Sequence, residues 1–135
     1  MDFKKLHFIW DDTKPESIAF AKRLMGVLQQ SSPEEADAII SVGGDGLLLH
    51  TLREANVPVY GITPPGSASR GFWTDHDVTS AEDLIKNLAR AEAIALTPLR
   101  ADILFADGRH AIRHAFNDVA IERGSAQAVK ISLTG

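Results

Sequence analysis

The chain has 135 residues, of which 44% are hydrophobic and 24% charged, as in an ordinary globular protein. Its formal net charge of −4, without a basic run, argues against a nucleic-acid-binding surface. It contains no cysteine, which excludes a disulfide framework and a thiolate zinc site and fits a reducing compartment. No segment approaches the ~20 apolar residues of a membrane span, and the first residues lack the apolar core of a signal peptide. We therefore expect a cytoplasmic protein that binds neither nucleic acid nor membrane.

The first 62 residues alternate between short apolar runs and segments with helical spacing. Residues 6–10 form an apolar run that ends at Asp11, and Pro15 then opens a segment whose apolar residues repeat with the period of an amphipathic helix. Residues 38–42 and 57–62 are two further apolar runs, separated by a second helical segment. We therefore expect βαβ units with a parallel sheet, right-handed crossovers, and ligands bound beyond the carboxyl ends of the strands.

The most informative motif follows the second of these strands, where three glycines surround one carboxylate in Gly43-Gly44-Asp45-Gly46. Glycines supply positive φ angles and bring bare amides to the start of a helix, an arrangement that binds phosphate. Because a carboxylate repels phosphate, we expect Asp45 to do chemistry, either by accepting a proton or by holding a phosphate-bound cation. A plain strand-to-helix turn needs one or two glycines and seldom an acid, so a purely structural role is the less favoured alternative.

A long segment without periodicity, residues 63–77, follows the third strand. Its Gly/Pro/Ser-rich first part leads through Gly71 to the aromatic pair Phe72 and Trp73. Long loops after parallel strands are often functional. The aromatic pair offers a face on which a purine can stack, whereas aromatic residues after a loop also enter cores, and we weigh the two roles equally.

The sequence pattern changes character near Pro98. Before it, residues 80–91 predict a capped helix that turns Leu84, Ile85 and Leu88 inward. Beyond it the period is two, Asp107-Gly108 predicts a hairpin, and the alternation continues over 116–122 and 128–133. We therefore expect an α/β domain with the glycine loop over 1–98, and over 99–135 the start of a mostly β, sandwich-like domain that is incomplete.

Two adjacent polar residues interrupt an apolar stretch of the β region, at Asn117 and Asp118. An amide and a carboxylate side by side can pair with the vicinal hydroxyls of a ribose, and the alternative is an Asx turn at a strand start. The five histidines share no ligand spacing, so we expect no metal held by the protein itself.

Three features occur in order along the chain: the Gly-Gly-Asp-Gly loop, Gly71-Phe72-Trp73-Thr74-Asp75, and Asn117-Asp118. This ordered set resembles the NAD kinase family, and it is more specific than the glycine loop alone, which diacylglycerol and sphingosine kinases and phosphofructokinases share. The resemblance implies an N-terminal α/β domain, a C-terminal β-sandwich and a homo-oligomer, either dimer or tetramer. It also implies phosphoryl transfer to the adenosine 2′-hydroxyl of NAD, giving NADP, from ATP or polyphosphate with Mg²⁺ carried by the donor.

Carried over by position, the resemblance gives each site residue a role. Asp45 would activate the hydroxyl, Gly44 and Gly46 would border the phosphates with Gly43 in the same cofactor-binding loop, and Phe72 would lie against the adenine. Asn117 and Asp118 would hold a ribose. The chain departs from the family at Leu47, where many members have threonine, and at Thr63, where asparagine is common. It has no counterpart of the family's later glycine- and threonine-rich segment, so we expect little or no kinase activity from the isolated chain.

Three alternatives remain at this level. A lipid kinase of the diacylglycerol type would share the glycine loop. A non-catalytic module would capture a nucleotide through the same loop without turning it over. An inactive fragment would self-associate through an exposed sheet edge.

Overall fold

The structure, a computed structural model, describes residues 3–122, 124 and 132–134. The chain divides into two compact units, Met1–Ala95 and Leu96–Gly135. The first unit contains all the buried hydrophobic side chains of the described residues, and it carries the glycine loop.

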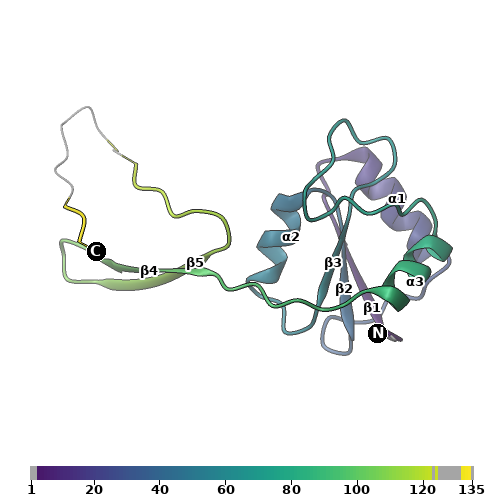
Figure 1. Cartoon of the computed structure of the whole chain (residues 1–135), viewed down its shortest axis with the longest axis horizontal. Helices are drawn as coiled ribbons and strands as arrows, with labels where there is room; N and C mark the ends of the chain where they lie inside the picture. Colours follow the sequence, from purple (N-terminus) through teal and green to yellow (C-terminus); the bar gives the residue numbers. More distant parts are fainter. Residues whose placement is uncertain (1–2, 123, 125–131, 135) are drawn as a thin grey trace. The chain divides into compact units, whose positions relative to one another are not determined.

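The first unit is built on three parallel strands, β1 (Leu6–Trp10), β2 (Ala38–Val42) and β3 (Val59–Ile62), in the order β1-β2-β3 (Figure 1). The predicted parallel sheet is therefore confirmed. The third strand begins two residues later than expected, because Pro58 has no N–H to donate to a neighbouring strand, although its carbonyl accepts from the Ile39 amide at 2.9 Å.

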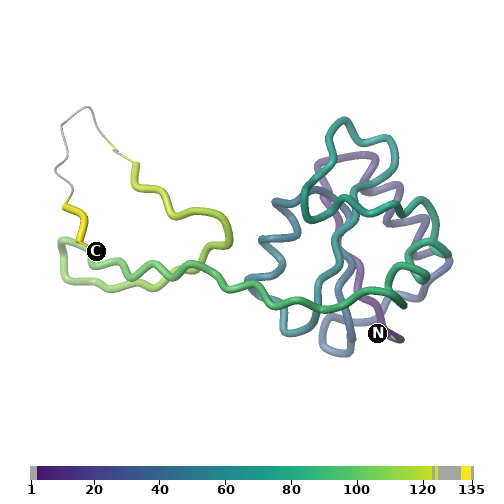
Figure 2. Tube along the Cα trace, viewed as in Figure 1, coloured from purple at the N-terminus to yellow at the C-terminus, as the bar shows by residue number. Residues whose placement is uncertain are grey.

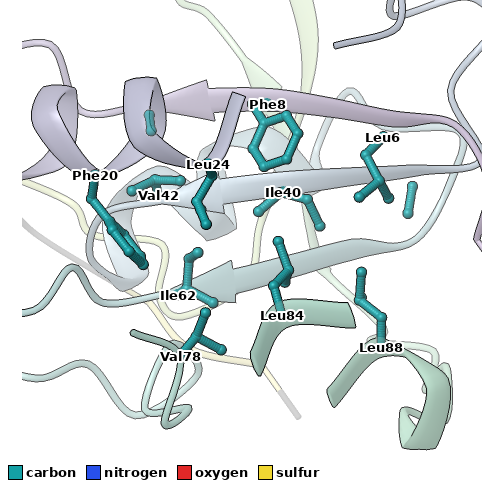
Figure 3. Close-up of a cluster of buried hydrophobic side chains, with 12 residues drawn as sticks. Leu6, Phe8, Phe20, Leu24, Ile40, Val42, Ile62, Val78, Leu84 and Leu88 are labelled. Carbon is teal, nitrogen blue, oxygen red and sulfur yellow. The ribbon is translucent and has the colours of Figure 1, made fainter. Parts of the chain in front are cut away.

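Three helices cover the two faces of this sheet. Helices α1 (Pro15–Met25) and α3 (Ala81–Arg90) pack on one face, where they form the core with side chains of all three strands (Figure 3). The buried residues of this cluster are Leu6, Phe8, Phe20, Ala21, Leu24, Ala38, Ile40, Val42, Ile62, Val78, Leu84 and Leu88. Helix α2 (Asp45–Leu52) lies on the other face, with Leu48 against the backbone of Gly61.

The placement of α1 and α2 on opposite faces has a topological result. After α1 the chain first forms a parallel bridge between Gln30 and Leu6, on the edge of β1 opposite to β2, and only then returns to β2. The connection through α2 advances the other way, from β2 to β3. Because the two connections advance in opposite directions on opposite faces, they have the same hand, as the expectation of two right-handed crossovers requires. This arrangement places the start of α2 on the sheet face that is not occupied by α1 and α3.

Helix α3 begins with a side-chain cap, as expected from the sequence. The Ser80 hydroxyl accepts a hydrogen bond from the Asp83 amide at 3.1 Å, and the Asp83 carboxylate accepts from the Thr79 amide and hydroxyl at 3.1 and 2.8 Å. Leu84 and Leu88 are buried, but Ile85 is 44% exposed. The expectation that Ile85 also faces inward is wrong, because only one residue in each of these turns of α3, first Leu84 and then Leu88, is buried against the core.

The second unit contains a two-stranded antiparallel hairpin, β4 (Leu99–Leu104) and β5 (His110–Ala115). The predicted turn is present, with Gly108 at φ +86°. Residues 116–122 have no regular structure, so the strand expected there is wrong; apolar alternation is a propensity that needs a neighbouring strand. The expected strand over 128–133 falls mainly on residues outside the described part. No helix among the described residues is both long and apolar enough to cross a membrane.

Candidate functional site

The glycine loop joins the carboxyl end of β2 to the first turn of α2. The Gly43 amide extends the sheet ladder by donating to the Ile62 carbonyl at 2.9 Å, and the first intrahelical bond runs from the Leu48 amide to the Gly44 carbonyl at 3.3 Å. The amides between these two bonds are the unpaired donors that every helix presents at its start. They create a local positive field that favours an anionic group.

The fold restricts only one of the three loop glycines to a residue without a side chain. Among the described residues, positive φ angles occur only at Gly66 and Gly108, so the expectation that the loop glycines supply positive φ is wrong. At Gly43 a Cβ would be crowded by Leu47 Cδ2 at 3.2 Å and Asp11 Cβ at 3.3 Å. At Gly44 and Gly46 a Cβ would meet nothing within 4 Å. The fold therefore tolerates side chains at these two positions.

Asp45 is the first residue of α2, and its carboxylate is held by the loop that follows β3. Oδ2 accepts from the Phe72 amide at 2.7 Å, and Oδ1 accepts from the Trp73 amide at 2.9 Å and from the Thr74 hydroxyl at 3.4 Å. Figure 2 traces this loop at the end of the sheet where β2 leads into α2. These contacts join residues 27 to 29 positions apart, and they fix the rotamer of the one acid in the glycine loop.

Close packing of backbone against side chains brings the loop to Asp45. A Cβ on Gly71 would collide with Asp45 Oδ1 and with Thr74 Oγ1, so only glycine fits there. A Cβ on Gly61 would lie 2.6 Å from Thr74 Cγ2. The Thr63 amide donates to the Thr74 carbonyl at 2.9 Å, and the two threonine hydroxyls lie 2.9 Å apart.

Phe72 presents its side chain to solvent next to Asp45. It is 81% exposed and makes an edge-to-face contact with Trp73, with ring centroids 5.1 Å apart. The alternative that it enters the core is therefore excluded, and most of its side chain is open to solvent. The structure thus brings Gly43, Gly44, Asp45, Gly46 and Phe72 together in the first unit. Asn117 and Asp118 are exposed residues of the second unit.

Asp11 ends β1 beside the glycine loop. Its amide donates to the Val42 carbonyl at 3.1 Å, and its Cβ is a neighbour of Gly43. Hydrogen bonds from the Thr13 hydroxyl and the Thr13 amide, together with the charge of Lys14, lower the pKa of Asp11 below its usual value. The Asp11 carboxylate is therefore occupied by hydrogen bonds within its own turn.

Arg70 is the cation nearest in sequence to the aromatic pair. Its guanidinium pairs with Asp75 and, at 3.3 Å, with Asp77, which raises the pKa of Arg70 further above its usual value. The pocket that it borders has a volume of about 110 Å³ and is lined by loop residues 63–67, Arg70 and residues 76–79. With two carboxylates on the guanidinium, Arg70 is poorly placed to neutralise a phosphate.

Metal-binding side chains do not gather anywhere in the described part of the chain: no three histidines or carboxylates there form a group that could hold an ion. The contacts that hold Asp45, and above all the contact with Thr74, are not predicted from the sequence. The only signal was its place directly after the aromatic pair, since burial of a hydroxyl leaves no pattern in a sequence.

A parallel sheet with a glycine loop, free helix-start amides and an ionisable side chain at the carboxyl ends of its strands is an arrangement typical of phosphate-binding α/β proteins. No family model matches the chain. It is 31% identical over 99% of its length to the NAD kinase of Zymomonas mobilis subsp. mobilis, and 38% identical over 75% of its length to that of Cereibacter sphaeroides. These comparisons confirm that the chain resembles the NAD kinase family. It spans about half the length of the curated relatives it matches, 52% and 40% of these two.

Proposed function

We propose that this chain contributes the phosphate-binding loop and the proton-accepting carboxylate of an NAD kinase, which transfers a phosphoryl group from ATP to the adenosine 2′-hydroxyl of NAD. The observation that carries this proposal is Gly46. A glycine in a helix is less stable than alanine by about 0.5–1 kcal/mol, and the fold leaves open space where its side chain would be. A ligand that must approach the backbone closely explains why glycine stands there.

Each reacting atom has a partner in this proposal. The 2′-hydroxyl gives its proton to Asp45 while its oxygen forms a bond to the γ-phosphorus, and the bond from that phosphorus to the bridging oxygen of ADP breaks. The helix-start amides bind the phosphate oxygens, and Mg²⁺ carried by ATP neutralises their charge. The chemistry demands positioning and charge neutralisation, which one held carboxylate and a ring of amides supply.

The remaining residues extend the proposal to the nucleoside parts. The exposed face of Phe72 stacks on the adenine, and Asn117 with Asp118 holds a ribose. Gly43 and Gly44 complete the cofactor-binding loop. Polyphosphate as an alternative donor, a cytoplasmic location and a homo-oligomer follow from the family resemblance alone. The names of the curated relatives favour this function over a lipid kinase with the same glycine loop.

The test is calorimetric titration of the chain with ATP–Mg²⁺ and with NAD, for the unchanged sequence, Gly46→Ala and Asp45→Asn. We expect Gly46→Ala to weaken ATP–Mg²⁺ binding at least about tenfold, because its Cβ blocks close approach to the amides, while thermal stability stays equal or rises. Asp45→Asn keeps the affinity for ATP–Mg²⁺, because the phosphates bind the helix-start amides rather than the carboxylate. Unchanged ATP affinity in Gly46→Ala, or no binding by the folded unchanged chain, would contradict the proposal.

A further inference from the structure

Thr74 combines complete burial with a polar side chain. It is 0% exposed, and its hydroxyl lies 3.4 Å from Asp45 Oδ1 and 2.9 Å from the Thr63 hydroxyl. A buried hydroxyl without partners is unfavourable, so the pairing of this group stabilises one arrangement of the loop. In this arrangement the Thr74 hydroxyl holds the carboxylate of Asp45.

The direction of these hydrogen bonds follows from counting donors and acceptors. An ionised carboxylate only accepts, so the single proton of the Thr74 hydroxyl goes to Asp45 Oδ1. The Thr63 hydroxyl must then donate to Thr74, and it in turn faces the Gly71 amide at 3.5 Å. The result is a one-way chain of hydrogen bonds from the Gly71 backbone through two threonines to Asp45.

The two carboxylate oxygens of Asp45 are unequal as a consequence. Oδ1 accepts from the Trp73 amide and from the Thr74 hydroxyl, which uses both of its lone pairs. Among the described residues, Oδ2 accepts only from the amide of Phe72, a residue that is mostly exposed. One lone pair of Oδ2 therefore stays available on the side where a ligand can arrive.

We propose that Thr74 is a positioning residue for Asp45: its hydroxyl holds Oδ1 and thereby makes Oδ2 the oxygen that receives the proton of the substrate. The identity of the substrate hydroxyl rests on the function proposed above, whereas the positioning of the carboxylate does not. Thr63 supports Thr74 by supplying the hydrogen bond that Thr74 accepts.

Two substitutions separate the hydroxyl of Thr74 from its methyl group, which packs on Gly61. Thr74→Val keeps the shape and removes the hydroxyl, and Thr74→Ser keeps the hydroxyl and removes the methyl group. If Thr74 positions Asp45, the valine variant is impaired and the serine variant is close to the unchanged chain. A role in packing alone gives the reverse order.

The first measurement is amide hydrogen exchange by NMR on the unchanged chain and the two variants. We expect Thr74→Val to speed exchange at Phe72 and Trp73 about tenfold, since their acceptor is no longer fixed, and to leave the sheet amide of Ile40 nearly unchanged. In Thr74→Ser the exchange at all three stays within about threefold of the unchanged chain. Equal acceleration at Ile40 and at the loop amides, or a serine variant as impaired as the valine variant, would overturn the proposal.

The second measurement is the affinity for NAD in a double-substitution cycle with Asp45→Ala. We expect Thr74→Val to weaken binding about fivefold when Asp45 is present and to have no further effect when it is absent, because the hydroxyl acts through the carboxylate. Additive effects mean that Thr74 does not act through Asp45. If the folded chain does not bind NAD, the proposed function fails while hydrogen exchange still decides the positioning of Asp45.

Discussion

At the scale of single residues, the glycines around Asp45 divide into those that the fold requires and those that it does not. Gly71 and Gly61 let backbone pass close to Asp45, Thr74 and Leu48, whereas Gly44 and Gly46 border open space. All four look alike in the sequence. The difference depends on neighbours that are distant along the chain, so it can be seen only once the fold is known.

This division predicts opposite effects of the same substitution at two positions. Gly71→Ala should lower the free energy of unfolding by about 1–3 kcal/mol, because the added methyl group displaces Asp45 and Thr74. Gly46→Ala is the matched control and should leave it unchanged or raise it by about 0.5–1 kcal/mol. Urea unfolding followed by circular dichroism measures both. A Gly71→Ala variant as stable as the control would show that the loop does not lie against Asp45 as described.

The chemistry of the site was more accessible from the sequence than its geometry. Asp45 stands out in the sequence because a carboxylate among glycines conflicts with phosphate binding, and Phe72 because an aromatic residue follows a long loop. The amides that hold Asp45 were not foreseen, since they lie 27 and 28 positions away and backbone amides carry no signature in a sequence. The positive φ angles expected of the loop glycines were wrong for a related reason. Glycine can stand at a position because the backbone needs a positive φ angle there or because a ligand needs access to the backbone, and a sequence does not distinguish the two.

At the scale of elements, the strands with a buried face were predicted best. The bounds of β1 and β2 are those that the sequence indicated, because a continuous apolar run between polar residues leaves little freedom. The expected strand over 116–122 failed because a strand needs a neighbour and alternation does not specify one.

The cap of α3 predicts how the stability of the first unit changes with pH. Hydrogen bonds from the Thr79 hydroxyl and amide and the contact with Ser80 lower the pKa of Asp83 below its ordinary value of 3.8. A carboxyl group with a lowered pKa in the folded state stabilises it above the pKa of the unfolded state, and this contribution disappears as the pH falls through the folded value.

We therefore expect Asp83→Asn to be less stable than the unchanged chain at neutral pH, and the difference to disappear as the pH falls through the folded-state pKa of Asp83, where both side chains become uncharged. Urea unfolding of the two proteins across this range is the measurement. The control is Asp12→Asn, at an acid outside any helix cap, whose effect should be small throughout. A penalty for Asp83→Asn that persists undiminished in acid would mean that shape rather than charge sets the strength of the cap.

At the scale of the whole molecule, stability is distributed unevenly between the two units. Every hydrophobic side chain that is buried in the described part of the chain belongs to residues 6–88. The described residues of the second unit form a two-stranded hairpin, and isolated hairpins of this kind are marginally stable in water.

A fragment of residues 1–95 should therefore fold by itself, with a thermal midpoint within about 3 °C of that of the whole chain. Circular dichroism measures this. The far-ultraviolet signal reports the helices, and the near-ultraviolet signal reports the packing of Trp10 and Trp73. The complementary fragment 96–135 should show no cooperative transition. Loss of cooperative melting in the fragment 1–95 would indicate that the second unit supports the fold of the first.

The open space beside Gly46 has a consequence for anyone who engineers this protein. Screens that rank variants by heat resistance reward alanine in a helix, and nothing in the fold opposes it at this position. Under the proposed function, the same change closes the approach to the phosphate-binding amides. A library sorted for thermostability alone would thus enrich variants that are well folded and heat-tolerant but do not bind the ligand. Selection for ligand binding therefore has to accompany the thermostability screen from the first round.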